Sequence, residues 1–319
     1  IPAAPKDVGR LSLVLTSAVS SIAGRSNPLG FRSSASVIVV MVDGLGLENL
    51  LEFAGHAPFI TGSYKANPIS LRSECPSTTV LSLTSVATGL RAGQHGLVGY
   101  TVIDAVAGKR VNLLSGWEQG QGDPAHWKTY QTLAEQHPGL IRVIAPNQYA
   151  KSGFTALTLA GTVFNGVDDV SSRFQAAKSQ SKAPGITYLY VPELDQAGHR
   201  FGPKSDEWIS VLETIDSEMQ TLVNAGIPTV LTADHGMVNC DERISIDEEL
   251  ALHVDMRTRE LVEQGMREAD ARHEAMREFG EFEPILLSRI EITSPTGLHT
   301  HAGTPFRPID GDPNQYFFE

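Results

Sequence analysis

Three short apolar runs, each leading into acidic residues, constrain the fold of this chain more than any other feature of its sequence. Each run is followed within four residues by an aspartate: Val37–Val42 by Asp43, Ile186–Val191 by Asp195, and Ile227–Thr232 by Asp234. The runs are rich in β-branched residues, as is typical of strands that are buried on both faces of a parallel sheet. Open α/β sheets carry their functional groups at the carboxyl ends of such strands, so we expect the three aspartates to meet there.

The segment between the second and third runs predicts a helix that packs on this sheet. Its apolar residues recur at steps of three and four, at Trp208, Val211, Leu212, Ile215, Met219 and Leu222. Leu140–Ile144 and Ala156–Ala160 are interpreted as a further pair of strands. The fold class predicted is therefore α/β, a doubly wound and mostly parallel sheet flanked by helices.

Length and composition are compatible with one catalytic domain over residues 1–319. A chain of 319 residues with 41% hydrophobic content can bury a full α/β core. Residues Asp247 to Phe279 are dense in Arg and Glu and predict one or two exposed helices. Because this stretch lies between two groups of candidate site residues, we expect 246–292 to form a small helical cap or insertion.

Two groups of oxygen and nitrogen donors follow the second and third runs. They are Asp195-Gln-Ala-Gly-His199 and Asp234-His235-Gly-Met237. Carboxylate and imidazole donors in two tight groups indicate a site for two metal ions. A pair of divalent cations about 4 Å apart is a general device for phosphoryl chemistry, because it stabilises both the attacking and the leaving oxygen.

A hydroxyl nucleophile is available in the segment Cys75-Pro-Ser-Thr78-Thr79. This segment predicts the start of a helix, where backbone N–H groups and the helix dipole favour an anion. A Thr hydroxyl at its ordinary pKa is a poor nucleophile, and coordination to a cation is one way to activate it. Thr79 taken alone is also typical of a helix N-cap.

The order of these motifs resembles the alkaline phosphatase superfamily, and within it the nucleotide pyrophosphatase/phosphodiesterase branch. The segment from Asp195 to Pro203 is similar to the D-x-x-G-H-x-x-G-P pattern of that branch, and the segment from Asp234 to Met237 matches its D-H-G-M. Pro76 to Thr79, followed by Thr88-Gly89-Leu and Gln94-His-Gly96, resembles its nucleophile block. Counting back ten residues from Gly89 selects Thr79 over Thr78.

The resemblance implies an alkaline phosphatase-like core that hydrolyses phosphate esters through a phospho-threonine intermediate. It implies one metal held by Asp43, Asp234, His235 and the Thr79 oxygen, and a second held by Asp195, His199 and His301. His299 is the alternative to His301 as last ligand. Zn²⁺ suits this mixed donor set, and Mn²⁺ uses similar ligands. Where the branch places an Asn that binds a phosphate oxygen, this chain has Tyr100, whose phenol donates one hydrogen bond.

The resemblance points first to a phosphodiesterase or nucleotide pyrophosphatase acting on a small phosphorylated substrate, which includes nucleotides. A phosphonate hydrolase that cleaves a C–P bond, or a phosphomonoesterase, would use the same metals and Thr79. A phosphomutase is disfavoured because the chain is short for the inserted domain of such enzymes. A metal-braced binding module is disfavoured because Thr79 stands where a nucleophile belongs.

Charge and cysteine content bear on partners and compartment. The net charge is 25 − 37 = −12, which argues against non-specific nucleic-acid binding, since that needs a basic face. No apolar run approaches the ~20 residues that cross a bilayer.

Cys75 and Cys240 are expected to be reduced thiols in a cytoplasmic protein. The start Ile1-Pro-Ala-Ala-Pro5 is interpreted as processed or trimmed, so export after signal removal remains an alternative. Oligomeric state is left open.

Overall fold

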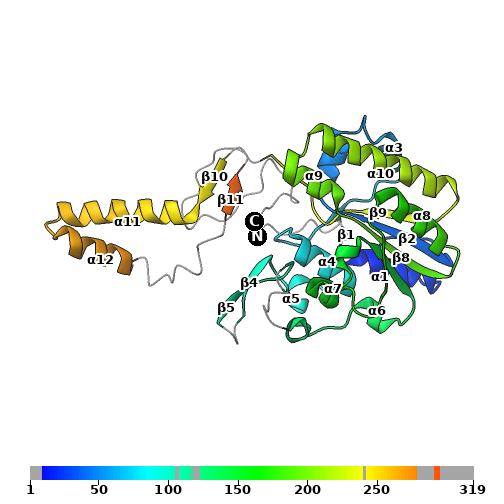
Figure 1. Cartoon of the computed structure of the whole chain (residues 1–319), viewed down its shortest axis with the longest axis horizontal. Helices are drawn as coiled ribbons and strands as arrows, with labels where there is room; N and C mark the ends of the chain where they lie inside the picture. Colours follow the sequence, from blue (N-terminus) through cyan, green and yellow to red (C-terminus); the bar gives the residue numbers. More distant parts are fainter. Residues whose placement is uncertain are drawn as a thin grey trace. The chain divides into compact units, whose positions relative to one another are not determined.

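A five-stranded parallel sheet forms the centre of the larger part of the chain (Figure 1). The structure is a computed structural model that describes residues 9–104, 108–115, 117, 123–239, 242–278 and 291–294. In spatial order the strands are β7 (Val163–Gly166), β6 (Ile141–Ala145), β8 (Gly185–Val191), β2 (Ser36–Val42) and β9 (Thr229–Thr232). All three strands predicted to precede aspartates are present and adjacent, which confirms the parallel α/β sheet.

The strand register brings the ends of these three strands to one edge of the sheet. Val42 of β2 is paired with Val191 of β8, and Met41 is paired with Thr232 of β9. Parallel strands in this register deliver the residues that follow them to the same place. The loops that carry Asp43, Asp195 and Asp234 therefore leave the sheet side by side.

Helices cover both faces of the sheet, as a doubly wound fold requires (Figure 1). On one face lie α2 (Leu47–Glu52), α3 (Pro58–Ala66), α8 (Val170–Gln180), α9 (Glu193–Phe201) and α10 (Asp206–Asn224). On the other lie α1 (Leu13–Ile22), α4 (Thr79–Thr88) and α6 (Leu133–Gln136). Strand β2 shows why both faces are needed, because Ile38, Val40 and Val42 pack on the first face and Val37, Val39 and Met41 on the second.

The predicted amphipathic helix between the second and third runs is α10. Its residues Trp208, Leu212 and Ile215 are fully buried against the sheet. Asp216, also on α10, accepts backbone hydrogen bonds from Phe59 and Ile60 at the start of α3. Helix α10 thus provides both apolar contact area and a carboxylate that caps a neighbouring helix.

One strand prediction is wrong. Ala156–Ala160 was expected to form a strand, but α7 (Gly153–Thr158) occupies most of it and the strand β7 begins at Val163. The Ser152 hydroxyl accepts a hydrogen bond from the backbone N–H of Thr155, so an N-cap starts the helix. Leu157 is completely buried and Ala156 is exposed, which fits a helix with one apolar side better than a strand buried on both faces.

Smaller elements complete the part of the chain up to Asn239. The paired strands are β1 (Gly9–Arg10) with β3 (Leu71–Arg72), and β4 (Thr101–Asp104) with β5 (Lys109–Asn112). The short helices are α5 (Ala92–His95), η2 (Pro124–Trp127) and η3 (Asn147–Tyr149). Among the helices that the structure describes, none has both the length and the apolar composition needed to cross a membrane.

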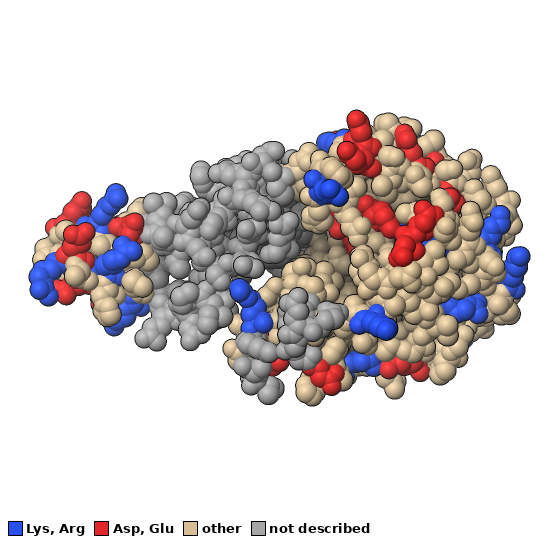
Figure 2. All heavy atoms as spheres, viewed as in Figure 1, with Lys and Arg blue, Asp and Glu red and all other residues tan. Residues whose placement is uncertain are grey.

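The described residues after Asn239 belong to a second compact unit. Its described elements are β10 (Glu242–Ser245), α11 (Ile246–Glu263), α12 (Glu268–Glu278) and β11 (Glu291–Ser294), with β10 and β11 antiparallel. The two helices pack through Val254, Leu261, Ala271 and Ala275. Figure 2 shows acidic and basic side chains interspersed on this helical pair, where Arg272 lies 2.7 Å from Asp255. The sequence predicted one or two helices in this stretch, and the structure has two, α11 and α12. A cap role for 246–292 stays a prediction.

Helix α5 ends in a buried histidine whose ring has a defined protonation state. His95 is 1% exposed; its Nδ1 accepts a hydrogen bond from the Leu97 N–H, and its Nε2 lies 2.9 Å from the Ser85 hydroxyl. The neutral ring satisfies both contacts, with Nε2–H as donor. Burial lowers the pKa of His95 from 6.5 to about 4.

We predict that His95 lowers the free energy of unfolding in mild acid. Below pH 6.5 the unfolded chain takes up a proton on His95 that the folded chain resists down to about pH 4, so stability falls across that window. Between pH 7.5 and 5 the loss attributable to His95 should be about 2 kcal/mol. Urea unfolding of the unsubstituted chain and of His95→Gln at both pH values measures it; an equal acid-induced loss in both proteins would contradict the prediction.

Candidate metal centre and nucleophile

Three side chains predicted as metal ligands converge at the carboxyl edge of the sheet. One donor atom each from Asp43, Asp195 and His235 lies within 4.8 Å of the others. They come from the ends of β2, β8 and β9 and are therefore brought together only by the sheet. The trio contains members of both predicted ligand sets, so the two sets adjoin one another.

His235 is at the centre of the cluster. Its Nε2 lies 3.2 Å from Asp43 Oδ1, 3.4 Å from Asp234 Oδ2 and 3.1 Å from the Thr79 hydroxyl. Its other ring nitrogen, Nδ1, lies 3.1 Å from the carbonyl oxygen of Gly236 and can donate to it. Metal-binding histidines commonly donate one N–H to a backbone carbonyl in this way, which directs the second nitrogen at the ion.

Each carboxylate of the cluster has a buried oxygen that accepts no well-aligned hydrogen bond from the described residues and faces an imidazole nitrogen only at ion-pair distance. These atoms are Asp43 Oδ1, Asp195 Oδ1 and Asp234 Oδ2. The second Asp234 oxygen accepts backbone hydrogen bonds from Gly44 and His235, at 3.2 Å and 3.0 Å, which fixes the carboxylate orientation. Orphaned buried acceptors are costly, and a divalent cation satisfies several of them at once. The donor set fits a metal site.

The pKa values of the cluster reflect crowding of negative charge. Burial and the nearby Asp43 carboxylate raise the pKa of Asp195 to about 6. Burial and Asp43 also raise the pKa of Asp234 well above its usual range. Burial opposes charging of His235, but the neighbouring Asp234 and Asp43 outweigh it and raise the pKa of His235 well above 6.5. The site favours positive charge, as a metal site must.

The remaining predicted ligands differ in position. His199 lies on α9 one turn after Asp195, with its Nε2 3.5 Å from Asp195 Oδ1 and its side chain 57% exposed. This places the pair on the same side of α9, as the i,i+4 spacing predicts. His299, His301 and Cys240 lie outside the described residues. Cys75 is exposed and carries a free thiol.

The structure distinguishes the two adjacent threonines. Thr78 is the N-cap of α4, and its hydroxyl accepts a hydrogen bond from the Leu81 N–H. Thr79 is the first residue of the helix, and its hydroxyl instead faces His235 at 3.1 Å. Thr79 is thus the threonine brought to the cluster. Tyr100 has a 40% exposed side chain and is not among the residues that line the adjacent cavity, so its phosphate contact stays a prediction.

Two side chains that the sequence interpretation missed hold the ligand loops. The Asn49 side chain on α2 donates to the carbonyl of Met237 at 2.7 Å and accepts from its N–H at 2.9 Å, and so clips the loop that carries Asp234 and His235. The Tyr190 hydroxyl near the end of β8 donates to Asp43 Oδ2. Because Tyr190 lies near the end of a predicted strand, the sequence could have indicated it as a partner of the site. No sequence pattern around Asn49 indicated that its side chain holds a ligand loop.

Close backbone contacts explain the glycines of these loops. Gly44 has a φ of +77°, and a Cβ there would lie 3.1 Å from Asp195 Oδ1. A Cβ on Gly46 would lie 2.6 Å from the Cα of Gly236. The two ligand loops therefore touch through their backbones, and side chains at these positions would separate them.

Comparison with known proteins agrees with the geometry. The model of the family described as type I phosphodiesterase/nucleotide pyrophosphatase matches residues 37–283. A human bis(5′-adenosyl)-triphosphatase is 25% identical over 68% of this chain and 52% of its own length. An uncharacterised pyrophosphatase/phosphodiesterase of Schizosaccharomyces pombe is 23% identical over 64% and 45%. The chain thus spans about half the length of these two relatives.

The fold also matches a solved structure. Murine ectonucleotide pyrophosphatase/phosphodiesterase 5, an inactive variant in complex with AMP, superposes with a TM-score of 0.51 at 20% identity. The match covers 67% of this chain and 61% of the murine chain. At this identity the match supports the fold.

We predict that Asn49 supports the metal centre from outside it. Removing the amide in Asn49→Ala frees the loop of Asp234 and His235, and loss of such outer support typically lowers metal affinity about 10- to 100-fold. Asn27 makes the same two-bond clip with the backbone of Phe31, so Asn27→Ala is a matched control. Calorimetric titration with Zn²⁺ should show weaker binding for Asn49→Ala only; equal affinities in the two variants would contradict the role.

Proposed function

Because the chain belongs to the type I phosphodiesterase/nucleotide pyrophosphatase family, we propose that it is a metal-dependent hydrolase of phosphodiester or phosphoanhydride bonds, with Thr79 as nucleophile. One contact supports this proposal above all: the Thr79 hydroxyl lies 3.1 Å from His235 Nε2, beside the Asp43 and Asp195 carboxylates. The Thr79 hydroxyl thus lies at the start of α4 and next to the cluster proposed to bind cations. Both features favour attack on an anionic phosphate.

The metal sites we propose follow the predicted ligand sets. Asp43, Asp234 and His235 would hold one divalent ion near Thr79, and Asp195 and His199 would contribute to a second, with His301 as its last ligand. Bound there, the ions would lower the pKa of the attacking oxygen and neutralise charge on the leaving oxygen. Zn²⁺ suits the carboxylate and imidazole donors, with Mn²⁺ as the alternative.

The protein groups have separable tasks in the reaction. The Thr79 oxygen forms a bond to phosphorus and releases its proton to water, while the bond from phosphorus to the leaving oxygen breaks and that oxygen keeps the electron pair. Water then hydrolyses the phospho-threonine, which frees the Thr79 hydroxyl. Tyr190 orients Asp43 through its hydroxyl, and the Gly236 carbonyl orients His235 through Nδ1. The start of α4 would lie toward the phosphate oxygens, where the helix dipole favours negative charge.

The substrate class we propose is a small phosphodiester. The names of the human and yeast relatives concern nucleotide polyphosphates and phosphodiesters, so nucleotide substrates belong in the first screen. Hydrolysis of bis(p-nitrophenyl) phosphate, a dinucleoside polyphosphate and p-nitrophenyl phosphate, each with added Zn²⁺ or Mn²⁺, tests the class. Turnover of the monoester alone would transfer the assignment to a phosphomonoesterase.

We predict that Thr79→Ala lowers turnover of the best diester at least about a thousandfold, because the covalent step is lost. Metal content, measured by elemental analysis, should change little. Thr78→Ala is the matched control: it removes an N-cap at a cost of about 1 kcal/mol in stability but keeps the hydroxyl that faces His235. A dead Thr78→Ala beside an active Thr79→Ala would reassign the nucleophile.

We further predict that the unsubstituted chain carries two divalent ions and that His301→Ala carries one. Loss of one of three protein ligands leaves a cation under-coordinated, so affinity at that site collapses. His299→Ala should retain both ions and at least about a tenth of the rate, since a substitution outside the coordination shell has only a small effect. The reverse pattern would make His299 the ligand. Two ions in both variants would mean that neither histidine of this segment is the last ligand of the second metal ion.

A further inference from the structure

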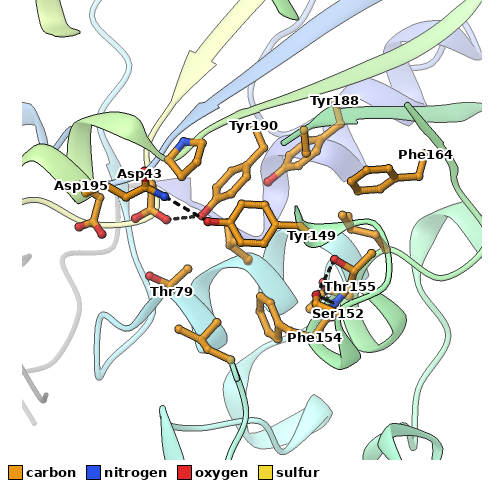
Figure 3. Close-up of a pocket in the computed structure, with 17 residues that line it drawn as sticks. Asp43, Thr79, Tyr149, Ser152, Phe154, Thr155, Phe164, Tyr188, Tyr190 and Asp195 are labelled. Carbon is orange, nitrogen blue, oxygen red and sulfur yellow. Dashed lines mark hydrogen bonds between the residues drawn. The ribbon is translucent and has the colours of Figure 1, made fainter. Parts of the chain in front are cut away.

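A cavity of about 280 Å³ opens beside the candidate nucleophile (Figure 3). Asp43, Thr79 and Asp195 are among its lining residues, and most of the other lining side chains are aliphatic or aromatic. No Lys, Arg or His is among the described residues that line it. A phosphate placed at Thr79 therefore meets no cationic side chain in this wall, and the hydrogen-bond donors that the wall offers are neutral groups.

The phosphate needs such a donor. A diester phosphate spreads its negative charge over two non-bridging oxygens, and donors held in place at these oxygens favour the transition state. The sequence predicted Tyr100 for this task, but its side chain is 40% exposed and is not among the residues that line the cavity. The task is therefore open to another hydroxyl.

Most of the other hydroxyls in the lining are directed elsewhere. Ser152 donates to Thr155 Oγ1 at 3.0 Å, and Figure 3 shows this pair at the other end of the cavity from Asp43. Thr158 donates to a backbone carbonyl of its own helix at 2.8 Å. Tyr190 donates to Asp43. None of these hydroxyls is placed to meet a phosphate at Thr79.

The hydroxyl of Tyr188 lies too deep in the sheet for this task. Tyr188 precedes Tyr190 by two residues on β8, so it lies on the same face of the sheet but roughly 7 Å farther from the carboxyl end. Its side chain is only 4% exposed. Asp43 directly follows Val42, which pairs with the last residue of β8. Tyr190 is therefore the nearer of the two tyrosines to the metal centre.

Tyr149 has a free donor at the level of the metal centre. It belongs to η3, which follows the carboxyl end of β6, and Figure 3 shows its side chain directed toward Asp43 beside Tyr190. Its hydroxyl accepts a hydrogen bond from Gln196 Nε2 at 3.2 Å and donates to none of the described residues. The O–H proton of Tyr149 is thus available to a ligand.

Gln196 connects this hydroxyl to the helix that carries two candidate metal ligands. It directly follows Asp195 on α9, and His199 lies on the same helix. The Tyr149 oxygen is therefore held relative to the metal centre by a side chain of α9. A donor held in this way loses little freedom when a phosphate binds.

Tyr149 also keeps its proton. Burial raises the pKa of its phenol, and the Asp43 and Glu193 carboxylates raise it too, against the opposing effect of the Gln148 and Gln196 side chains. A free tyrosine already ionises only near pH 10. At neutral pH the group is therefore an O–H donor, which attracts a phosphate oxygen where a phenolate would repel it.

We propose that the Tyr149 hydroxyl donates a hydrogen bond to a non-bridging phosphate oxygen of the substrate while Thr79 attacks. The proton stays on Tyr149 throughout, so no group is transferred. Gln196 is a positioning residue, because it acts on the phosphate only through Tyr149. This inference rests on the proposed phosphodiesterase function and adds a substrate-binding residue to it.

The first test removes the hydroxyl and keeps the ring. In metal-loaded Tyr149→Phe, kcat/KM for bis(p-nitrophenyl) phosphate should fall about 10- to 100-fold, because a hydrogen bond to a charged oxygen is lost. Metal content by elemental analysis should not change. Tyr130→Phe is the matched control, since its hydroxyl donates to the Leu157 carbonyl and does not line the cavity, and it should keep at least about half of the rate. An unchanged rate in Tyr149→Phe would overturn the inference.

Sulfur substitution shows whether the hydroxyl acts on the phosphate itself. The substrates are the two mirror-image forms of methyl p-nitrophenyl phosphorothioate, each with sulfur in place of one non-bridging oxygen, and methyl p-nitrophenyl phosphate is the reference. Sulfur accepts hydrogen bonds weakly. Tyr149→Phe should therefore lower the oxygen-to-sulfur ratio of kcat/KM for one form at least about threefold and leave the ratio for the other form unchanged.

Two outcomes of the sulfur experiment would overturn the inference. A merely structural effect of Tyr149→Phe would lower all three rates alike and keep both ratios. A change of ratio in Tyr100→Phe, with none in Tyr149→Phe, would assign the contact to Tyr100.

A double substitution tests the role of Gln196. Gln196→Leu should lower kcat/KM for bis(p-nitrophenyl) phosphate about 3- to 10-fold with metal content unchanged, since Tyr149 loses the group that holds it. Residues that act through one another are not additive. Gln196→Leu combined with Tyr149→Phe should therefore match Tyr149→Phe alone, and losses that multiply would overturn the positioning role.

The same assays separate this inference from the proposed function. Thr79-dependent turnover of diesters with a rate and oxygen-to-sulfur ratios that ignore Tyr149→Phe refutes the Tyr149 contact alone. Absence of Thr79-dependent turnover of every diester refutes the proposed function and, with it, the role of Tyr149.

Discussion

The crowding of three carboxylates at one edge of a buried sheet is the constraint on which the rest of this structure depends. Asp43 and Asp234 are almost completely buried, and Asp195 lies beside them. Burial would raise the pKa of Asp43, but the adjacent His235 imidazole lowers it, so the negative charge is kept there. That charge raises the pKa of both neighbouring aspartates. Divalent cations resolve such repulsion better than one imidazolium does, because each brings two charges and several coordination positions.

Much of the surrounding structure holds these like charges in place. Gly44 and the Gly46–Gly236 contact let the loops approach closely, and Asn49 joins the loop after β9 to α2. Arg173, whose side chain is fully buried, pairs with Glu193 at the start of α9, the helix that carries Asp195 and His199. The guanidinium also donates to two backbone carbonyls after β7. The cluster is thus supported by groups outside it, as the ligands of metal sites are supported by their outer-shell partners.

The apolar cavity and the charged cluster share a boundary at Tyr190. Its hydroxyl serves Asp43, while its ring contacts Tyr149 at a centroid distance of 6.0 Å and lines the cavity. One residue therefore lies between the charged cluster and an apolar cavity.

The sequence alone determined the parallel sheet, the helix α10 and the clustering of Asp43, Asp195, Asp234 and His235, because buried strands have a distinctive composition and parallel strands end at one edge. It misplaced the strand at Ala156–Ala160, since a short apolar run suits a helix or a strand equally until a cap such as Ser152 decides it. Only the tertiary structure showed that Thr79 rather than Thr78 has its hydroxyl at His235, that Asn49 clips the ligand loop, and that a largely apolar cavity lies beside Thr79. Each of these depends on side chains far apart in the chain, whose directions are set by packing and leave no local pattern to interpret.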